Sequence, residues 1–198
     1  ILYYKIYENE KQIMQNKKIL RTFAKEKRKT LNIKEISRQI RENIKKLSEY
    51  KSADNILLYA PINNETDVLQ LLDESKNFYL PKVNQDRKTL SIFSHKKNSV
   101  LINNFWGIPE PDTEREKQIS PSALDIVVIP ALMADKRGFR LGYGGGFYDR
   151  FLPFLSKNCT KIIPIPHILL YDELPYEEHD QRADYIITEK EIFQIRDL

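Results

Sequence analysis

Apolar residues recur at helical spacing in two stretches near the amino end of the chain. From residue 12 to residue 29 they follow a loose helical period within a highly charged background. The second stretch is more regular, and Asn32 precedes it as an N-cap residue with Glu35 three positions on. Its apolar positions are Ile33, Ile36, Ile40, Ile44 and Leu47. The pattern predicts two helices, and the apolar stripe of the second must pack on another element.

Short runs rich in β-branched and aromatic residues follow these helices. They cover residues 56–59, 78–80, 90–93, 126–129, 162–165 and 185–187. Several are apolar throughout rather than alternating, which is typical of strands covered on both faces. A helical segment is predicted between strands at residues 68–74. We therefore predict an α/β fold, a single-domain three-layer open sheet that is mostly parallel, with helices on both faces.

The strand ends indicate where a ligand should bind. Prolines, which lack a backbone N–H, stand at four strand ends: Pro61, Pro81, Pro130 and Pro164. Open α/β sheets bind ligands beyond the carboxyl ends of their strands. We therefore expect the chemistry just after Tyr59, Leu80 and Ile129. The charged stretch 113–122 is predicted to be a flexible loop.

The composition fits a folded protein of the cytoplasm. With 41% hydrophobic residues, the 198-residue chain is too apolar to be disordered. The single Cys159 excludes an internal disulfide framework and a four-cysteine zinc site, and it fits a reducing compartment. The apolar runs are far shorter than the roughly 20 residues of a membrane span. The first residues lack the basic start and apolar stretch of a secretory signal.

The charge of the chain favours a polyanionic ligand. The formal net charge is +4, and basic residues crowd the first predicted helix. They are Lys17, Lys18, Arg21, Lys25, Lys27, Arg28 and Lys29. A solvated helix face would explain this cluster equally well. The sign of the charge alone does not distinguish nucleic acid from the phosphates of a nucleotide.

Residues 137–150 carry the clearest chemical signal, reading Arg-Gly-Phe-Arg-Leu-Gly-Tyr-Gly-Gly-Gly-Phe-Tyr-Asp-Arg. Five of the six glycines in the chain lie here, so successive N–H groups can turn toward one anion. A helix starting near Phe147 would add its amino-terminal dipole. Arg140 offers donors to phosphate oxygens, and Asp149 offers a carboxylate suited to magnesium. The stretch predicts a phosphate-binding loop, against the alternative of a flexible glycine-rich turn.

Other site chemistries find no support in the sequence. The glycine segment has neither the Gly-Lys-Ser/Thr ending of a P-loop nor the dinucleotide-binding pattern. The three histidines and one cysteine lack zinc-site spacing, and no Gly-x-Ser-x-Gly elbow occurs. We interpret His95 as a solvated loop residue, and His179 as a residue that orients Asp180 or bonds the backbone.

The segment 130–152 closely resembles the signature of the 5-formyltetrahydrofolate cyclo-ligase family, also called methenyltetrahydrofolate synthetases. Four other blocks resemble the family in the same order: Lys-x-x-Leu-Arg at 17–21, Glu-Thr-Asp at 65–67, Leu-Pro-Lys-Val at 80–83 and Phe-Trp-Gly-Ile-Pro-Glu-Pro at 105–111. Residues 173–175, 179–180 and 184–189 resemble its carboxyl-terminal block. We predict a cyclo-ligase domain at residues 17–198, preceded by an extension at residues 1–16.

The resemblance implies an ATP- and magnesium-dependent cyclisation of 5-formyltetrahydrofolate to 5,10-methenyltetrahydrofolate. ATP would phosphorylate the formyl oxygen, and ADP and phosphate would be released. It implies magnesium as cofactor, ATP as co-substrate and small molecules as the only partners. We expect a monomer that binds neither nucleic acid nor a membrane.

The resemblance also implies roles for individual residues. Arg140 and Tyr148 would be catalytic, and Asp149 and Asp184 would hold magnesium. The ATP-binding set would be Lys17, with Lys18 as an alternative in register, Arg21, Arg140, Gly142, Tyr143, Gly144, Gly145, Gly146, Phe147 and Tyr148. The folate would meet Glu65 and Tyr148, with walls from Tyr59, Pro61 and Trp106, and Phe105 and Pro109 as further wall candidates. Each aromatic could instead be a core residue.

The sequence departs from the family pattern at two places. Ala131, Met133 and Ala134 differ from the residues more usual in the family, and residues 166–171 lack its glutamine.

Two other functions would also account for parts of the sequence. A basic nucleic-acid-binding module would show salt-sensitive RNA or DNA binding, but an aromatic RNA-binding motif is missing. A small-molecule kinase would use the same loop and leave a stable phosphorylated product.

Overall fold

The computed structural model describes residues 16–73 and 75–195. Its helices are α2 (Lys17–Lys29), α3 (Ile33–Lys46), α4 (Ser48–Ser52) and α5 (Phe147–Phe151). The short 3-10 helices are η1 (Leu69–Leu71), η2 (Pro121–Ala123), η3 (Leu152–Phe154) and η4 (His167–Leu169). The two predicted amino-terminal helices are thus present as α2 and α3, each capped by an asparagine side chain, Asn16 and Asn32. The predicted extension lies outside the described residues except for Asn16.

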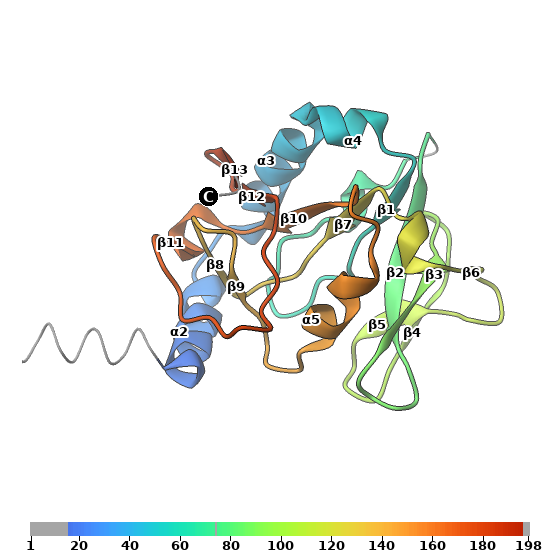
Figure 1. Cartoon of the computed structure of the whole chain (residues 1–198), viewed down its shortest axis with the longest axis horizontal. Coiled ribbons are helices and arrows are strands. Elements are labelled where there is room, and N and C mark those ends of the chain that lie inside the picture. Colours follow the sequence, from blue (N-terminus) through green and yellow to red (C-terminus); the bar gives the residue numbers. More distant parts are fainter. Residues whose placement is uncertain (1–15, 74, 196–198) are drawn as a thin grey trace, which may run out of the picture.

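Eight strands form one sheet in the order β13-β12-β10-β7-β1-β2-β3-β6 (Figure 1). Their bounds are β1 (Asn55–Leu57), β2 (Asn77–Val83), β3 (Leu90–Ser94), β6 (Gln118–Ile119), β7 (Ile126–Val128), β10 (Thr160–Pro164), β12 (Tyr185–Ile187) and β13 (Ile192–Gln194). The five central strands, from β12 to β2, are parallel. The outer strands β13, β3 and β6 are antiparallel. The mostly parallel sheet of an α/β protein is therefore confirmed.

Two smaller sheets flank the main one. The first contains β8 (Met133–Asp135), β9 (Arg140–Leu141) and β11 (Leu170–Tyr171). The second pairs β4 (Leu101–Asn103) with β5 (Pro109–Pro111). Through β8 and β9 the chain that leaves β7 folds back before it enters the glycine segment. The fold thereby places that segment close to the carboxyl end of β7.

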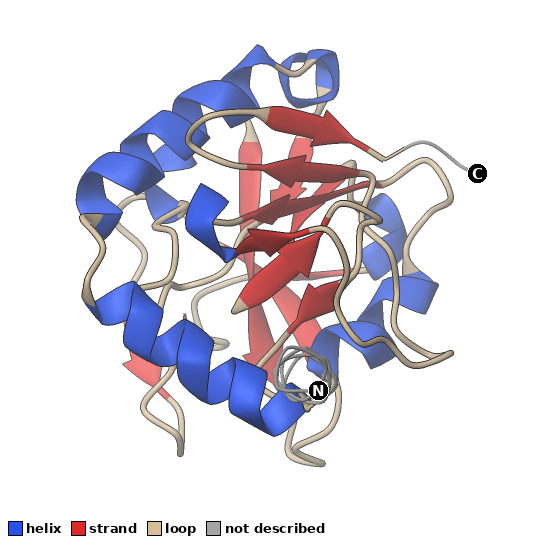
Figure 2. Cartoon of the chain, turned by 90° about the vertical axis from the view of Figure 1, so that its left-hand side faces the viewer, coloured by secondary structure: helices blue, strands red, loops and turns tan. Residues whose placement is uncertain are grey.

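Alternating residues of the central strands bury two separate hydrophobic clusters. In β7, Ile126 and Val128 join one cluster, while Val127 joins the other. The first cluster includes Ile40 and Ile44 of α3 and Tyr50 of α4. The second takes side chains from α2, α5 and η3. Helices are seen on either side of the strands in Figure 2. Burial on both sides explains why these strands are continuously apolar.

Three local predictions are corrected by the structure. Within 68–73 the structure has only the single 3-10 turn η1, because the backbone of Leu72 is no longer helical; Glu74 lies outside the described residues. The stretch 113–122 is not a free loop, since it contains β6 and the start of η2. Pro81 lies inside β2 rather than at its end, paired with Ile92 of β3.

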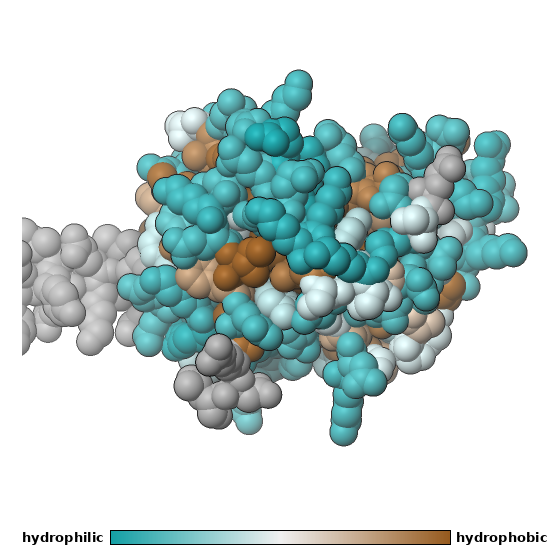
Figure 3. Space-filling model, turned by 90° about the horizontal axis from the view of Figure 1, so that it is seen from above, coloured by the Kyte–Doolittle hydropathy of each residue, from teal (hydrophilic) through white to brown (hydrophobic). Residues whose placement is uncertain are grey.

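The surface above α3 and α4 is largely hydrophilic, with small apolar areas, as Figure 3 shows. This agrees with the amphipathic pattern of α3, whose buried residues lie on the sheet side. Across residues 16–73 and 75–195, no helix is both long enough and apolar enough to cross a membrane.

Candidate active site

A cavity of about 830 Å³ opens beyond the carboxyl ends of β1, β2 and β7. Tyr59 and Ala60 follow β1, Val83 ends β2, and Pro130 follows β7; all four line the cavity. This is the edge of the sheet at which the sequence predicted a ligand. Residues 142–149 and two side chains of α2 form another part of its lining.

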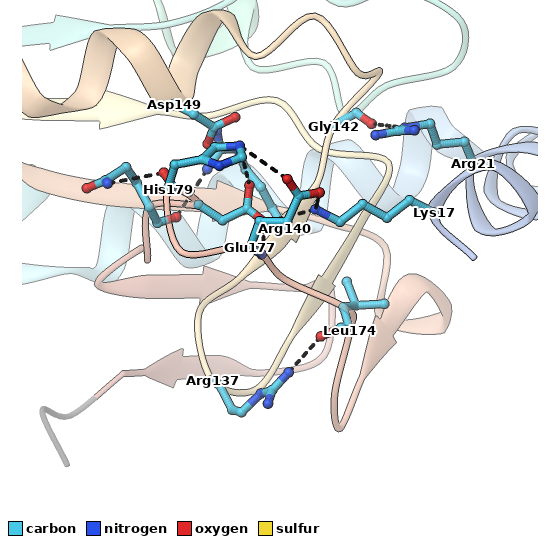
Figure 4. Close-up of polar contacts among 11 residues, drawn as sticks. Lys17, Arg21, Arg137, Arg140, Gly142, Asp149, Leu174, Glu177 and His179 are labelled. Carbon is cyan, nitrogen blue, oxygen red and sulfur yellow. Dashed lines mark hydrogen bonds and ion pairs between the residues drawn. The ribbon is translucent and has the colours of Figure 1, made fainter. Parts of the chain in front are cut away.

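One side of the cavity combines basic side chains with the glycine segment. Lys17 and Arg21 reach it from α2, and Arg21 Nε donates to the Gly142 carbonyl oxygen at 2.9 Å (Figure 4). Gly144 and Gly146 have φ angles of +102° and +64°, a region that favours glycine. A side chain at Gly145 would place its Cβ 2.7 Å from the Phe147 ring. The backbone path of the loop therefore depends on these glycines.

Arg140 and Asp149 form an ion pair in this region. Arg140 Nη2 lies 2.6 Å from Asp149 Oδ1, and Nη1 donates to the Gln181 carbonyl oxygen at 3.2 Å. Their side chains are only 6% and 19% exposed, so solvent screens the pair weakly. Asp149 lies in the first turn of α5. The Arg140 guanidinium and the Asp149 carboxylate are thus fixed side by side at the cavity wall.

Lys17 is held by two carboxylates from the loop before β12. Its ammonium group lies 2.8 Å from Glu177 Oε1 and 3.0 Å from Asp180 Oδ2, as Figure 4 shows for Glu177. The hydrogen bond from Lys17 and its positive charge lower the pKa of Glu177. These contacts orient the first turn of α2 toward the cavity.

The other side of the cavity is more apolar and includes the buried carboxyl group of Glu65. Glu65 is 5% exposed, and its Oε2 accepts a hydrogen bond from the Ile62 N–H at 2.9 Å. Burial raises the pKa of this carboxyl to about 7. The Tyr148 hydroxyl is also buried, and it has no hydrogen-bond partner within the described part of the chain. A polar ligand is the natural partner for such a group.

Trp106 lies at the rim, on the turn between β4 and β5. It is 49% exposed, and its ring meets the Phe147 ring edge-on at a centroid distance of 6.3 Å. Pro109 also lines the cavity, whereas Phe105 does not, being 79% exposed beyond it. An apolar rim of this kind suits a flat ring system.

Most residues predicted for the site line this one cavity; besides Phe105, three do not. Lys18 is exposed on α2, whereas Lys17 lines the cavity, so Lys17 is the one of the two that faces it. Pro61 stays outside the lining, although Ala60 and Ile62 belong to it. Asp184 stands before the amino end of β12, the opposite end from the carboxyl ends that face the cavity.

The surroundings of Asp184 explain its position. Its Oδ2 accepts a hydrogen bond from the Lys161 N–H at 2.7 Å and lies 3.1 Å from the Lys161 ammonium. It lines a separate cavity of about 470 Å³. The structure therefore does not bring Asp184 to Asp149 as the pair expected for magnesium. In residues 16–73 and 75–195 no cluster of three His, Cys, Asp or Glu residues could hold a metal ion.

Several residues of the lining had no assigned role in the sequence. Arg87, at the turn between β2 and β3, lines the cavity and lies over the Phe105 ring at 4.9 Å. Glu110 accepts hydrogen bonds from the Val83 N–H and the Asn104 side chain. Glu177 binds Lys17. The sequence could have indicated Glu110 as a site residue, because it belongs to the block 105–111. It gave no such indication for Arg87 or Glu177.

Two further expectations are settled by burial. His95 is only 6% exposed and is therefore not a solvated loop residue; burial lowers its pKa. Ala131, Met133 and Ala134, the departures from the family pattern, are buried in the core and do not line the cavity.

Comparisons with known proteins show what the whole chain is similar to. A sequence model of the 5-formyltetrahydrofolate cyclo-ligase family matches residues 12–189. The 5-formyltetrahydrofolate cyclo-ligase of Haemophilus influenzae is 32% identical over 135 residues, which are 61% of this chain and 72% of that protein. The Escherichia coli enzyme of the same name is 28% identical over 148 residues, 72% of this chain and 81% of that protein.

A solved structure is similar throughout. The 5,10-methenyltetrahydrofolate synthetase of Aquifex aeolicus superposes with a TM-score of 0.80 at 30% sequence identity, covering 92% of this chain and 94% of that one. The synthetase of Mycoplasma pneumoniae, at 24% identity and a TM-score of 0.69, shares the fold over 88% of this chain and 99% of its own. With its motifs gathered around one cavity and its sequence matched along most of its length, the chain belongs to the 5-formyltetrahydrofolate cyclo-ligase family of enzymes.

Proposed function

We propose that this enzyme cyclises 5-formyltetrahydrofolate to 5,10-methenyltetrahydrofolate and that the reaction depends on ATP and magnesium. The observation that carries the proposal is the single cavity of about 830 Å³, in which a basic, glycine-lined side adjoins an apolar side with a buried carboxyl group. The first side suits a polyphosphate, and the second suits a flat, polar-edged ring. One cavity can therefore hold both substrates in contact.

The proposed chemistry explains why ATP is needed. A formamide carbon is a weak electrophile, and its oxygen is a poor leaving group. Transfer of the γ-phosphoryl group forms a bond to the formyl oxygen and breaks the bond to ADP. The neighbouring folate nitrogen then attacks the formyl carbon, loses its proton, and phosphate departs with the oxygen. Ring closure follows without any oxidation or reduction.

The protein contributes mainly positioning and charge in such a transfer. Lys17 and Arg21 offer cationic donors for the phosphates, beside the N–H groups of residues 142–147. Arg140 is the buried guanidinium of the cavity wall and would stabilise charge on the transferred group. The Tyr148 hydroxyl, at the start of α5, has no hydrogen-bond partner among the described residues and would contact the reacting oxygen.

The folate would occupy the apolar side of the cavity. Tyr59 and Trp106 supply walls, and the Glu65 carboxylate accepts hydrogen bonds from the N–H groups of the ring. The Tyr59 hydroxyl donates to the Thr66 carbonyl oxygen at 2.9 Å, so its ring is fixed before the substrate binds. A pre-formed wall lowers the cost of ordering on binding.

Magnesium would be held by Asp149 together with the nucleotide. Magnesium typically takes one or two carboxylates, with substrate phosphates and water as its other ligands, so Asp149 could hold it without a second protein carboxylate. When bound, it would neutralise phosphate charge. Asp184 already binds Lys161 at the far edge of the sheet, and we do not include it in this site.

The test is to mix purified protein with 5-formyltetrahydrofolate, ATP and magnesium. We expect the methenyl chromophore to appear in step with ADP, one for one, and neither to appear when ATP, magnesium or folate is omitted. A stable phosphorylated product without the chromophore would instead identify a small-molecule kinase. ATP hydrolysis that ignores the folate would contradict the proposal as well.

A further inference from the structure

A buried arginine, Arg28, lies in the last turn of α2 and has no role in the function proposed so far. It is 1% exposed, although it belongs to the basic cluster that the sequence could place on a solvated helix face. Burying a guanidinium in a protein interior costs several kcal/mol unless its surroundings compensate the charge. The contacts of Arg28 therefore indicate the role of its buried charge.

The guanidinium of Arg28 is held by backbone carbonyls from two loops that border the cavity. Nη1 donates to the Asn64 carbonyl oxygen at 3.2 Å, and Nη2 donates to those of Ala131 and Leu132. Asn64 directly precedes Glu65, and Ala131 directly follows Pro130, which lines the cavity. Carbonyl dipoles compensate the cation without neutralising it, so its field still acts on the neighbouring groups.

The loop that Arg28 holds has an unusual backbone. Asn63 and Asn64 have φ angles of +48° and +57°, in the left-handed region that non-glycine residues rarely adopt. Two consecutive residues of this kind need external contacts to persist. The bond from Arg28 to the Asn64 carbonyl supplies one such contact one residue before Glu65.

The position of Arg28 on α2 links the two sides of the cavity. Residues 17, 21, 24 and 28 share one face of a helix, because they are spaced by three or four positions. Lys17 and Arg21 reach the phosphate side of the cavity, Ala24 packs in the core, and Arg28 lies under the folate side. One helix thereby carries two cations that line the phosphate side and a third cation behind the folate side.

Glu65 is the cavity carboxyl on which the charge of Arg28 acts. Burial raises the pKa of Glu65 to about 7, while its hydrogen bond from the Ile62 N–H and the positive charge of Arg28 lower it. The other titratable groups that face Glu65 are the hydroxyls of Tyr59, Tyr143 and Tyr148. All three have pKa values well above neutrality, so none is charged near pH 7.

We propose that Arg28 is a positioning residue for Glu65: it fixes the loop that carries the carboxyl group, and its positive charge favours the carboxylate form that binds the folate ring. The inference rests on the proposed function, because it assigns Glu65 to the folate. An ionised carboxylate accepts a hydrogen bond more strongly than a neutral acid does. Substrate capture should therefore follow the ionisation of Glu65.

The test is the pH profile of kcat/KM for 5-formyltetrahydrofolate between pH 5.5 and pH 9. In the wild type, kcat/KM should rise with pH through a midpoint near 7, where Glu65 ionises. Arg28→Gln removes the cation, so the midpoint should move up by about one pH unit. Gln is also too short to hold both loops, so kcat/KM should fall at every pH. At pH 7 it should fall about five-fold further, and this extra loss should disappear by pH 9, because the ionised fraction of Glu65 is restored.

Two matched variants separate charge from structure. Arg28→Lys keeps the cation but is too short to hold both loops, so kcat/KM should fall at every pH with an unchanged midpoint. Arg41 on α3 is also buried, and it holds the same stretch of chain through the Asp67 carbonyl oxygen at 2.6 Å. Arg41→Gln should leave the midpoint in place. A uniform loss in Arg28→Gln, or an equal shift in Arg41→Gln, would overturn the proposal.

A second measurement covers the case in which Arg28→Gln is unstable. The melting temperature at pH 8 is compared for four proteins: wild type, Arg28→Gln, Glu65→Gln and the double variant. Arg28→Gln should lower the melting temperature less when Glu65 is already neutral, because no buried anion is left uncompensated. Equal losses in both backgrounds would overturn the coupling. The melting test needs no turnover, so a wild type without methenyl formation would refute the proposed function alone.

Discussion

At the scale of single residues, the cavity wall brings two opposite charges together before any ligand binds. The Asp149 carboxylate pairs with the Arg140 guanidinium at 2.6 Å, and both side chains are mostly buried. A bound magnesium nucleotide offers each of them a new partner, a cation for Asp149 and a phosphate for Arg140. The pair is therefore placed where an exchange of partners can accompany substrate binding.

The substitution Asp149→Asn tests this role, because it keeps the size of the side chain and removes its charge. We expect turnover to fall by about 100-fold or more, with a much smaller change in melting temperature. Steady-state rates over a magnesium titration and a thermal melt measure the two effects. Asp172→Asn is the control, since Asp172 also pairs with a cation, Lys136, but on the surface. Unchanged turnover in Asp149→Asn would reject the metal role.

The buried carboxyl group of Glu65 lowers the stability of the folded protein at alkaline pH. Its folded-state pKa of about 7 exceeds the ordinary value of 4.5, so the folded protein binds the proton more tightly than the unfolded chain. The stabilising effect of the protonated acid is complete below pH 4.5 and is lost as the pH rises through 7. A buried carboxylate at pH 8 therefore makes the folded state less stable.

We accordingly expect Glu65→Gln to be more stable than the wild type at pH 8 but not at pH 4. A difference of about 2.5 pH units corresponds to about 3 kcal/mol in the free energy of unfolding. Urea unfolding at both pH values measures it, and loss of folate turnover should accompany the gain. A constant difference between the two proteins at pH 4 and pH 8 would mean that Glu65 is not the titrating group.

At the scale of elements, α2 determines how the nucleotide side is built. The Asn16 side chain accepts hydrogen bonds from the N–H groups of Lys18 and Ile19, which fixes the first turn that carries Lys17. The last turn is fixed differently, by the buried Arg28. Cationic groups for the cavity thus lie at both ends of a helix whose ends are separately anchored.

Loss of the α2 cap should therefore weaken nucleotide binding selectively. Asn16→Ala removes the cap, at a cost of about 1 kcal/mol in stability, and we expect the KM for ATP to rise several-fold with little change for the folate. Asn32→Ala is the matched control, because Asn32 caps α3, which does not line the cavity. It should lose similar stability and keep its KM for ATP. Equal KM changes in both variants would indicate a general loss of folding.

The same scale shows what the sequence can and cannot predict. Strand β7 was predictable because both of its faces are buried and every residue is apolar, and residues 162–164 of β10 are buried and apolar in the same way. The outer strand β6, with exposed Gln118, looks like loop, since it pairs on one side only. The burial of Arg28 could not be predicted, because nothing in the sequence distinguishes a buried arginine from the solvated basic residues around it. Only tertiary contacts distinguish them.

At the scale of the whole molecule, the cavity is assembled from distant parts of the chain. The glycine segment was recognisable because its composition is unusual. Arg87 and Glu177 reach the cavity only because the β2–β3 turn and the loop before β12 pack around it.

Arg150 forms a tie between two of these parts, that is, a pair of hydrogen bonds that connects them. Its Nε donates to the Lys88 carbonyl oxygen at 2.8 Å, and its Nη2 donates to that of Gly145 at 2.7 Å. It thereby joins the β2–β3 turn to the glycine loop.

Breaking this tie should loosen both substrate sites together, because the turn and the loop border one cavity. We expect Arg150→Ala to raise the KM for ATP and for the folate by about five-fold each, a modest loss for exposed hydrogen bonds. Trp106, the single tryptophan of the chain, lines the cavity, so its fluorescence reports folate binding directly. Arg38→Ala, which removes an exposed ion pair on α3, should change neither KM nor the fluorescence titration. If Arg150→Ala altered only one substrate's binding, the tie would serve that side of the cavity rather than the assembly of both.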